Sequence, residues 1–161
     1  MASPPCQPVE QDVLDFEIRC PVKTRVLSIL RNVATCVARE AGFCEEDIDQ
    51  IEMAVDEACA NVIRHAYSAG SDGQLPKIEP ADFVLHLQVC VSENRISFRV
   101  RDRGVGLDKK PEGARSIEEY VKRGGKGGLG IYIIRNFMDE VAYECPPGEG
   151  TILTMTKYLK A

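Results

Sequence analysis

Two alternating segments joined by three residues constrain the fold of this chain more than any other feature. Residues 83–91 and 95–102 alternate apolar and polar side chains, which is the period of a strand with one buried face. Their connection, Ser92-Glu93-Asn94, is short enough to predict an antiparallel hairpin. Any fold proposed for this chain must therefore contain an antiparallel pair of strands.

The flanking sequence predicts helices and further strands. Apolar residues repeat along one face of 22–41, where Pro21 favours the start of a helix and Gly42 favours its end. Acidic residues at 45–47 favour the start of a second helix, which runs to about residue 67. A short third helix is expected over 129–139. Further strands are predicted at 16–20, 141–144 and 151–159.

The order of these elements predicts an α+β two-layer sandwich, with a mostly antiparallel mixed sheet and helices packed on one face. The chain has 161 residues, of which 44% are hydrophobic and 28% charged, and this is enough for one globular core. We expect a flexible, Pro-rich segment over residues 1–11, followed by a single domain over 12–161.

Charge and cysteine usage exclude several function classes. The net charge of −5 argues against a nucleic-acid binder, because phosphate contacts need clustered Lys and Arg. No apolar run approaches the ~20 residues needed to span a bilayer. The seven cysteines are scattered and form no C-x-x-C pair, which disfavours a zinc site. Free thiols are typical of a reducing compartment, so we expect a cytoplasmic location.

The second predicted helix carries a polar stripe. Glu57 and Asn61 are four residues apart and project side by side, in line with Gln50 and Arg64 and with His65 at the edge. A carboxylate can accept a proton from a hydroxyl, and an amide oxygen is a suitable ligand for Mg²⁺. The alternative is a solvated polar face with a structural histidine at the helix end.

The first glycine-rich turn follows a predicted core strand. Asp102 continues the apolar face of that strand, where an ionisable group is costly unless it is paired or used. It could accept a hydrogen bond from an exocyclic amine such as that of adenine. Gly104 and Gly106 would let the backbone approach a ring closely. The alternative is that Asp-x-Gly only starts a turn.

The second glycine-rich turn leads directly into a predicted helix, and such a junction is an anion site because its N–H groups point outward. Lys126 adds a positive charge for phosphate. A flexible linker would also be rich in glycine, and the spacing does not match a P-loop. The residues of this turn are Gly127, Gly128, Leu129 and Gly130.

Two other features complete the candidate site. The charged, Gly-rich segment 103–126, with one helical turn expected at 116–121, is long for a connector and is typical of a functional lid. Thr151 shares strand parity with Leu153 and Met155, which predicts that it faces inward.

Taken in order, these motifs resemble those of the Bergerat-fold (GHKL) ATPases over 16–159. Residues 57–67 look like the N box of that family. Asp102-x-Gly104-x-Gly106 looks like its G1 box, and Gly128-Leu129-Gly130 looks like its G2 box. The continuation at 134–141 is similar to the anti-sigma-factor serine/threonine kinases.

The resemblance implies a site for ATP and Mg²⁺. Glu57 would be the general base and Asn61 the metal ligand. Asp102 would hold the adenine amino group, with Thr151 assisting through water. Lys126 would occupy the phosphate-facing position where the family leads us to expect an arginine. The glycines that would shape the pocket are Gly104, Gly106, Gly128 and Gly130.

The resemblance also implies a function. The protein would be a serine/threonine protein kinase that phosphorylates a STAS-domain anti-anti-sigma partner and binds a sigma factor. A homodimer could form through the exposed sheet or the first helix. One alternative is a nucleotide-dependent protein-binding switch with little or no kinase activity. Another is an ATP hydrolase module of a larger machine.

Overall fold

The computed structural model describes residues 12–67, 83–104, 116–122 and 128–160. Its five strands form one sheet in the order β1-β2-β3-β5-β4, and every pairing among these described strands is antiparallel. The strands are β1 Asp12–Pro21, β2 Val84–Ser92, β3 Arg95–Asp102, β4 Glu140–Glu144 and β5 Ile152–Tyr158.

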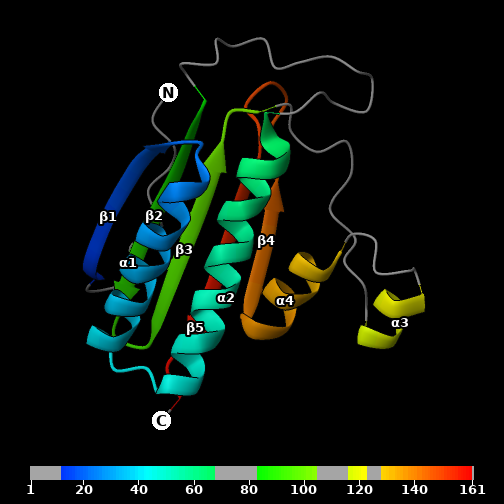
Figure 1. Cartoon of the computed structure of the whole chain (residues 1–161). Helices are drawn as coiled ribbons and strands as arrows, with labels where there is room; N and C mark the ends of the chain where they lie inside the picture. The colour runs from blue at the N-terminus through cyan, green and yellow to red at the C-terminus, as the bar shows by residue number, and fades with distance from the viewer. Residues whose placement is uncertain (1–11, 68–82, 105–115, 123–127, 161) are drawn as a thin grey trace.

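The helices form the second layer. Figure 1 shows α1 and α2 lying over one face of the sheet, with α4 beside α2 and α3 beyond α4. The predicted two-layer α+β architecture is therefore confirmed. The helical elements are a 3₁₀ turn Thr24–Val26, α1 Leu27–Glu40, α2 Glu45–Asn61, a π-helical turn Val62–Ala66, α3 Ile117–Lys122 and α4 Leu129–Phe137.

The core lies between the two layers, where the apolar faces of the helices meet the inward face of the sheet. Strand alternation places every second residue of β2 and β3 on that face, which explains why these segments read as half-buried strands. The largest fully buried side chains are Phe98, Leu30, Ile48, Ile51, Leu85, Leu87, Ile96, Ile134, Met155, Val55, Val89 and Val100.

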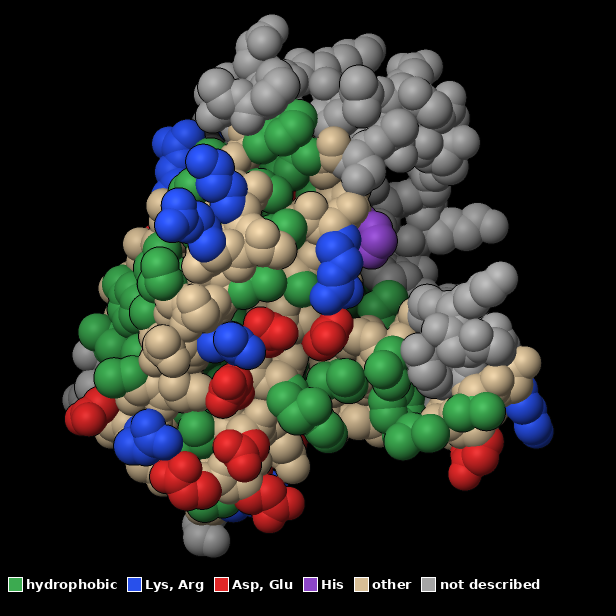
Figure 2. Space-filling view, viewed as in Figure 1, with side chains coloured by type: hydrophobic (Ala, Val, Ile, Leu, Met, Phe, Trp, Pro, Cys, Tyr) green, Lys and Arg blue, Asp and Glu red, His purple; other side chains and the backbone are tan. Residues whose placement is uncertain are grey.

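Charged and apolar side chains both occur on the outer surface of the helical layer. Figure 2 shows acidic and basic side chains interspersed over α1 and α2. One pair, Arg31 on α1 and Asp56 on α2, forms an ion pair of 3.5 Å between the two helices. Some large apolar side chains are exposed nonetheless, among them Ile29 at 58% and Met53 at 47%. Among the described residues, no helix is long and apolar enough to span a bilayer.

The first predicted strand and helix need correction. β1 is longer than the expected 16–20, because it pairs with β2 from Asp12 onward. Pro21 does not open a helix; it ends β1, opposite Val84. This position suits proline because β1 is an edge strand. A 3₁₀ turn then precedes α1, which begins at Leu27.

The third predicted helix is shorter than the expected 129–139. α4 ends at Phe137 because Met138 adopts an extended conformation, with φ −102° and ψ 146°. The backbone N–H of Asp139 then donates to the backbone oxygen of Thr156 at 2.9 Å. The chain therefore leaves the helix in order to join the sheet.

The strand order determines where the candidate site forms. β5 comes last in the chain but lies between β3 and β4. As a result, Thr151 comes next to Asp102, and the backbone N–H of Asp102 donates to the backbone oxygen of Thr151 at 3.1 Å. Two motifs that are 49 residues apart in the sequence thus meet at one end of the sheet.

Candidate functional site

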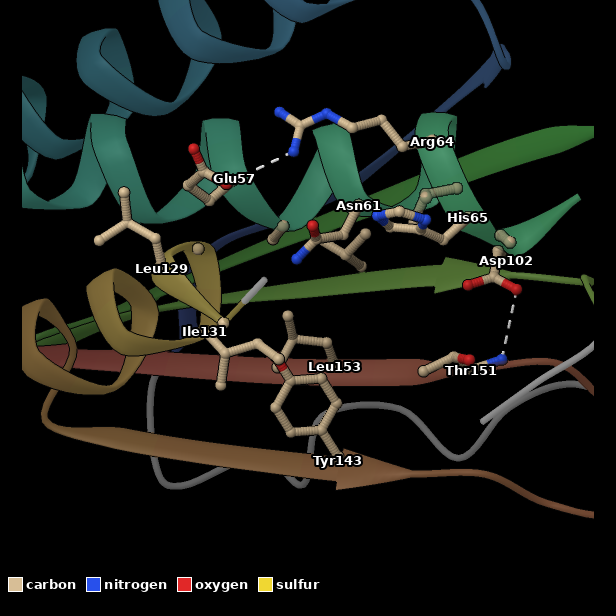
Figure 3. A pocket seen from close by; sticks show the side chains of 16 residues that line it. Glu57, Asn61, Arg64, His65, Asp102, Leu129, Ile131, Tyr143, Thr151 and Leu153 are labelled. Carbon is tan, nitrogen blue, oxygen red and sulfur yellow. Dashed lines mark hydrogen bonds and ion pairs between the residues drawn. The ribbon is translucent and has the colours of Figure 1, made fainter. Parts of the chain in front are cut away.

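A pocket of about 460 Å³ lies between α2, α4 and the sheet. Figure 3 shows side chains entering it from the helices on one side and from β3, β4 and β5 on the other. Its volume falls within the range that is usual for small-molecule and cofactor sites. The lining residues are Glu57, Ala58, Asn61, Val62, Arg64, His65, Ala66, Val100, Asp102, Gly128, Leu129, Gly130, Ile131, Tyr143, Thr151 and Leu153.

Most of the residues singled out in the sequence meet in this pocket. Gly104 is not in the lining, but it lies directly behind Asp102 and donates to it. Gly106, Lys126 and Gly127 lie outside the described residues, as does most of the predicted lid. The predicted site residues that line the pocket are Glu57, Asn61, Asp102, Gly128, Leu129, Gly130 and Thr151. Their roles toward a ligand stay predictions.

Asp102 forms the deep end of the pocket. It is the last residue of β3 and only 3% exposed. Its Oδ1 accepts hydrogen bonds from the backbone N–H of Gly104 at 2.8 Å and of Thr151 at 3.4 Å. Burial raises the pKa of this carboxyl, and the two N–H donors partly oppose that rise. A buried carboxylate held in this way can present its second oxygen to a donor on a ligand.

Tyr67 fixes the strand ends around Asp102. Its hydroxyl donates to the backbone oxygen of Val84 at 2.6 Å and accepts from the backbone N–H of Arg103 at 3.0 Å. Its ring stacks on Phe83 at 4.3 Å between centroids. Sequence reasoning placed Tyr67 only at the end of a helix, because these contacts are long-range and leave no local pattern.

Close backbone approach explains two of the glycines. A Cβ at position 104 would overlap the backbone oxygen of Ala66, in the π-helical turn that follows α2. A Cβ at position 130 would overlap the carboxylate of Glu57. A larger residue at position 104 would therefore push the π-helical turn away from the strand end, whereas one at position 130 would displace the carboxylate of Glu57. Such π-helical turns occur frequently at functional sites.

The helical wall carries the polar stripe predicted from the sequence. Glu57 and Asn61 lie side by side on α2, and both face the pocket (Figure 3). Arg64 approaches Glu57, with 4.0 Å between Nη1 and Oε2. The Glu57 side chain is 25% exposed, so a hydroxyl can reach it. This part of the stripe is not a purely solvated face, because Glu57 and Asn61 line the pocket.

The glycine turn opposite this wall begins α4. Gly128 adopts a left-handed conformation, with φ +87°, as the residue before the helix. Among the first N–H groups of an α-helix, several have no partner inside the helix, and they carry its positive end. The α4 N-terminus therefore offers donors to an anion beside Glu57 and Asn61.

The floor of the pocket is mostly apolar. Val100, Leu153 and Tyr143 follow one another across β3, β5 and β4. The hydroxyl of Tyr143 is buried, and no hydrogen-bond partner for it exists among the described residues. Burial raises the pKa of Tyr143 to about 12, with a small opposing effect of Arg135. Sequence reasoning missed this residue, although strand parity in 141–144 could have placed it inward.

This wall contains an oxygen donor of the kind that Mg²⁺ uses in nucleotide sites. No group of three or more His, Cys, Asp or Glu side chains gathers within the part of the chain that the structure describes. In nucleotide sites Mg²⁺ usually takes only one or two protein oxygens and completes its shell with phosphates and water. The amide oxygen of Asn61, beside the carboxylate of Glu57, is a donor of that kind.

Comparison with known proteins agrees with this geometry. The sequence profile of the histidine kinase-like ATPase domain matches residues 20–157. The chain belongs to the histidine kinase-like ATPase family. A relative in Bacillus licheniformis, the serine-protein kinase RsbW, is 32% identical over 89% of this chain and 85% of its own length. The protein of the same name in Bacillus pumilus is 33% identical over the same shares.

Two solved structures share the fold of this chain. The RsbU and RsbW domains of a Mycobacterium tuberculosis protein match with a TM-score of 0.59 and 16% identity, over 92% of this chain and 34% of that one. The blue-light activated histidine kinase of Erythrobacter litoralis matches with a TM-score of 0.52 and 20% identity, over 83% and 42%. At these identities the likeness concerns the fold alone.

Proposed function

We propose that this protein transfers the γ-phosphoryl group of ATP to a serine or threonine of a STAS-domain anti-anti-sigma partner, and that it binds a sigma factor in its other state. Its class, a protein serine/threonine kinase, rests on the relatives named serine-protein kinase and on the matching ATPase domain. The observation that carries the proposal is the convergence of Asp102, the Glu57–Asn61 pair and the α4 glycine turn in one pocket.

The pocket supports one orientation of ATP. The adenine amino group would donate to Asp102, and the ring would lie over the apolar floor. The phosphates would then reach the N-terminus of α4, where N–H groups of the glycine turn can bind them. Asn61 would hold Mg²⁺, which supplies positive charge to the phosphate oxygens. Lys126, outside the described residues, remains the proposed additional cation.

Glu57 is the proposed general base. It would take the proton from the attacking hydroxyl of the partner while that oxygen bonds to the γ-phosphorus. The bond between the γ-phosphorus and the bridging oxygen breaks, and ADP leaves with the electron pair. The negative charge that develops on the phosphate oxygens would be stabilised by the N-terminal N–H groups of α4. The accessible position of Glu57 in the pocket favours this chemistry over a binding-only switch.

Phosphotransfer to STAS-domain proteins from the same genome tests the proposal directly. With ATP labelled at the γ-phosphate, we expect label on a serine or threonine of one of them, identified by mass spectrometry. Glu57→Gln keeps the shape of the side chain but cannot take the proton, so transfer should fall by about 10²–10⁴ in single turnover. ATP should still bind this variant with an affinity close to that of the wild type.

The outcomes separate the candidate functions. ATP binding without transfer to any STAS protein would favour the nucleotide-dependent switch. Full transfer by Glu57→Gln would remove the general-base role. Sigma-factor binding, a homodimer and a cytoplasmic location are parts of the proposal that need their own measurements, for which co-purification followed by mass spectrometry is the first step.

A further inference from the structure

A buried lysine joins the far end of α4 to α2. Lys157 lies on β5, and its side chain is 3% exposed. Its ammonium group donates to the backbone oxygen of Phe137 at 2.7 Å and to Oε1 of Gln50 at 2.8 Å. Oδ1 of Asp47 lies 3.3 Å away. Lysine is almost never buried so completely unless its charge has partners.

These partners belong to a helix end and to the neighbouring helix. Phe137 is the last residue of α4, so its carbonyl has no acceptor role within the helix and carries the negative end of the dipole. Asp47 and Gln50 lie in the first two turns of α2. One ammonium group therefore ties the carboxyl end of α4 to both α2 and β5.

The opposite end of α4 forms part of the pocket. The helix begins at Leu129, and the backbone at Gly130 lies against the carboxylate of Glu57. Gln50 and Glu57 are seven residues apart on α2, which places them on one face two turns from each other. α4 has nine residues and is thus a rod of ~13 Å, so a shift at Phe137 is carried to the glycine turn.

We propose that Lys157 is a positioning residue for the phosphate-binding end of the pocket. By holding Phe137 against α2, it sets the place of the glycine turn beside Glu57 at the other end of α4. Lys157 does not line the pocket, so it acts through the elements that it joins, of which α4 carries the glycine turn. The inference rests on the proposed function, because it takes the glycine turn as the site of the ATP phosphates.

Nucleotide binding to Lys157→Met tests the inference. Methionine keeps an unbranched apolar stem but loses the three donors. Calorimetry should show ATP affinity, measured with Mg²⁺, reduced by about 2- to 30-fold, which is the range for a helix terminus acting on an anion. Affinity for adenosine should stay unchanged, because adenosine lacks phosphates and is held at Asp102. A merely structural lysine would weaken both ligands equally, and that result would overturn the proposal.

Lys160→Met is the matched control. Lys160 also contacts Oδ1 of Asp47, at 3.1 Å, but its side chain is 69% exposed and it makes no recorded contact with α4. The same substitution there should leave the ratio of ATP to adenosine affinity at the wild-type value. If both lysine variants changed that ratio equally, the effect would come from the charge of Asp47 and not from the anchoring of α4.

Hydrogen exchange gives a readout that does not need nucleotide. In Lys157→Met the amides of α4 should exchange at least several-fold faster, while the β2–β3 hairpin keeps its protection. If Lys157→Met does not fold, Gln50→Met removes one acceptor of the same link and should give a smaller change in the same direction. Unchanged α4 protection in a folded variant would disprove the anchor. Failure of the wild type to bind ATP would instead disprove the proposed function.

Discussion

A buried carboxylate is retained at Asp102, although neither of its recorded hydrogen-bond donors is charged. Burial raises its pKa above the ordinary value of 3.8, which means that folding favours the protonated form. That contribution to stability is fully present below pH 3.8 and is lost as the pH rises through the pKa of the folded state. Above the pKa of the folded state, the charge of this carboxylate therefore opposes folding.

Asp102→Asn should separate the effect of the Asp102 charge on stability from its proposed role in binding ATP. The amide oxygen can still accept from Gly104 and Thr151, but the side chain carries no charge. We expect a higher free energy of unfolding than the wild type at pH 7, with the difference shrinking as the pH falls toward 3.8. ATP affinity should fall, because the adenine amino group loses its anionic acceptor. Urea unfolding across this pH range and calorimetry would measure the two effects, and a variant less stable than the wild type at pH 7 would contradict the first.

Tyr143→Phe removes the buried hydroxyl that has no partner among the described residues. Burying an unsatisfied polar group costs about 1–3 kcal/mol, so its removal should stabilise the protein by up to that amount. Chemical denaturation of the nucleotide-free protein would detect the shift. Tyr67→Phe is the control, because the Tyr67 hydroxyl makes three recorded hydrogen bonds and its loss should destabilise. Destabilisation of both variants would mean that the Tyr143 hydroxyl has a partner.

At the scale of elements, the contact between the π-helical turn and the end of β3 requires a residue without a side chain at position 104, where the sequence has glycine. Gly104→Ala would place a Cβ on the backbone oxygen of Ala66. We therefore expect the free energy of unfolding to fall by about 1–3 kcal/mol, as it does at other overpacked sites. Gly42→Ala is a useful comparison because a Cβ there has open space and only the left-handed φ of +86° is strained. Thermal unfolding and ATP binding should show that Gly104→Ala alone weakens the nucleotide site. Equal ATP affinity in both variants would contradict this prediction.

Strands and helices were predictable where a local period was strong. The β2–β3 hairpin follows from alternation and a short connection, and α2 follows from its apolar face and acidic first turn. Pro21 was misplaced because its role depends on pairing with Val84, which is 63 positions away in the sequence. The end of α4 was misplaced for the same reason, since β5 draws the chain out of the helix.

The candidate site was predictable to the extent that strand parity and helix spacing report it. Asp102 and Thr151 follow from parity, and Glu57 and Asn61 follow from a spacing of four residues. Tyr67 and Lys157 were not found as site or positioning residues, because each acts through contacts made only when distant elements meet. Tertiary hydrogen bonds of this kind have no short-range signature in the sequence.

For the whole molecule, nucleotide binding should be visible as added stability. A ligand that binds only the folded state at 100 times its Kd adds about 2.7 kcal/mol, so ATP with Mg²⁺ should raise the Tm. GTP should add less, because Asp102 would face a carbonyl and the affinity should be about 5- to 150-fold lower. Thermal scans at matched concentrations of the two nucleotides compare them directly. Equal shifts would rule out the adenine role of Asp102.

The insertion of β5 between β3 and β4 has a consequence for how the protein is made. Synthesis proceeds from the N-terminus at about 5–20 residues per second, so β1, α1, α2 and the β2–β3 hairpin leave the ribosome first. At that stage β3 has an open edge, and neither Thr151 nor the floor residue Leu153 is present. The complete pocket cannot form until β5 pairs with β3. The residues that β5 brings to the pocket are therefore absent until that strand has emerged, and we expect ATP to stabilise the chain only from that point onward.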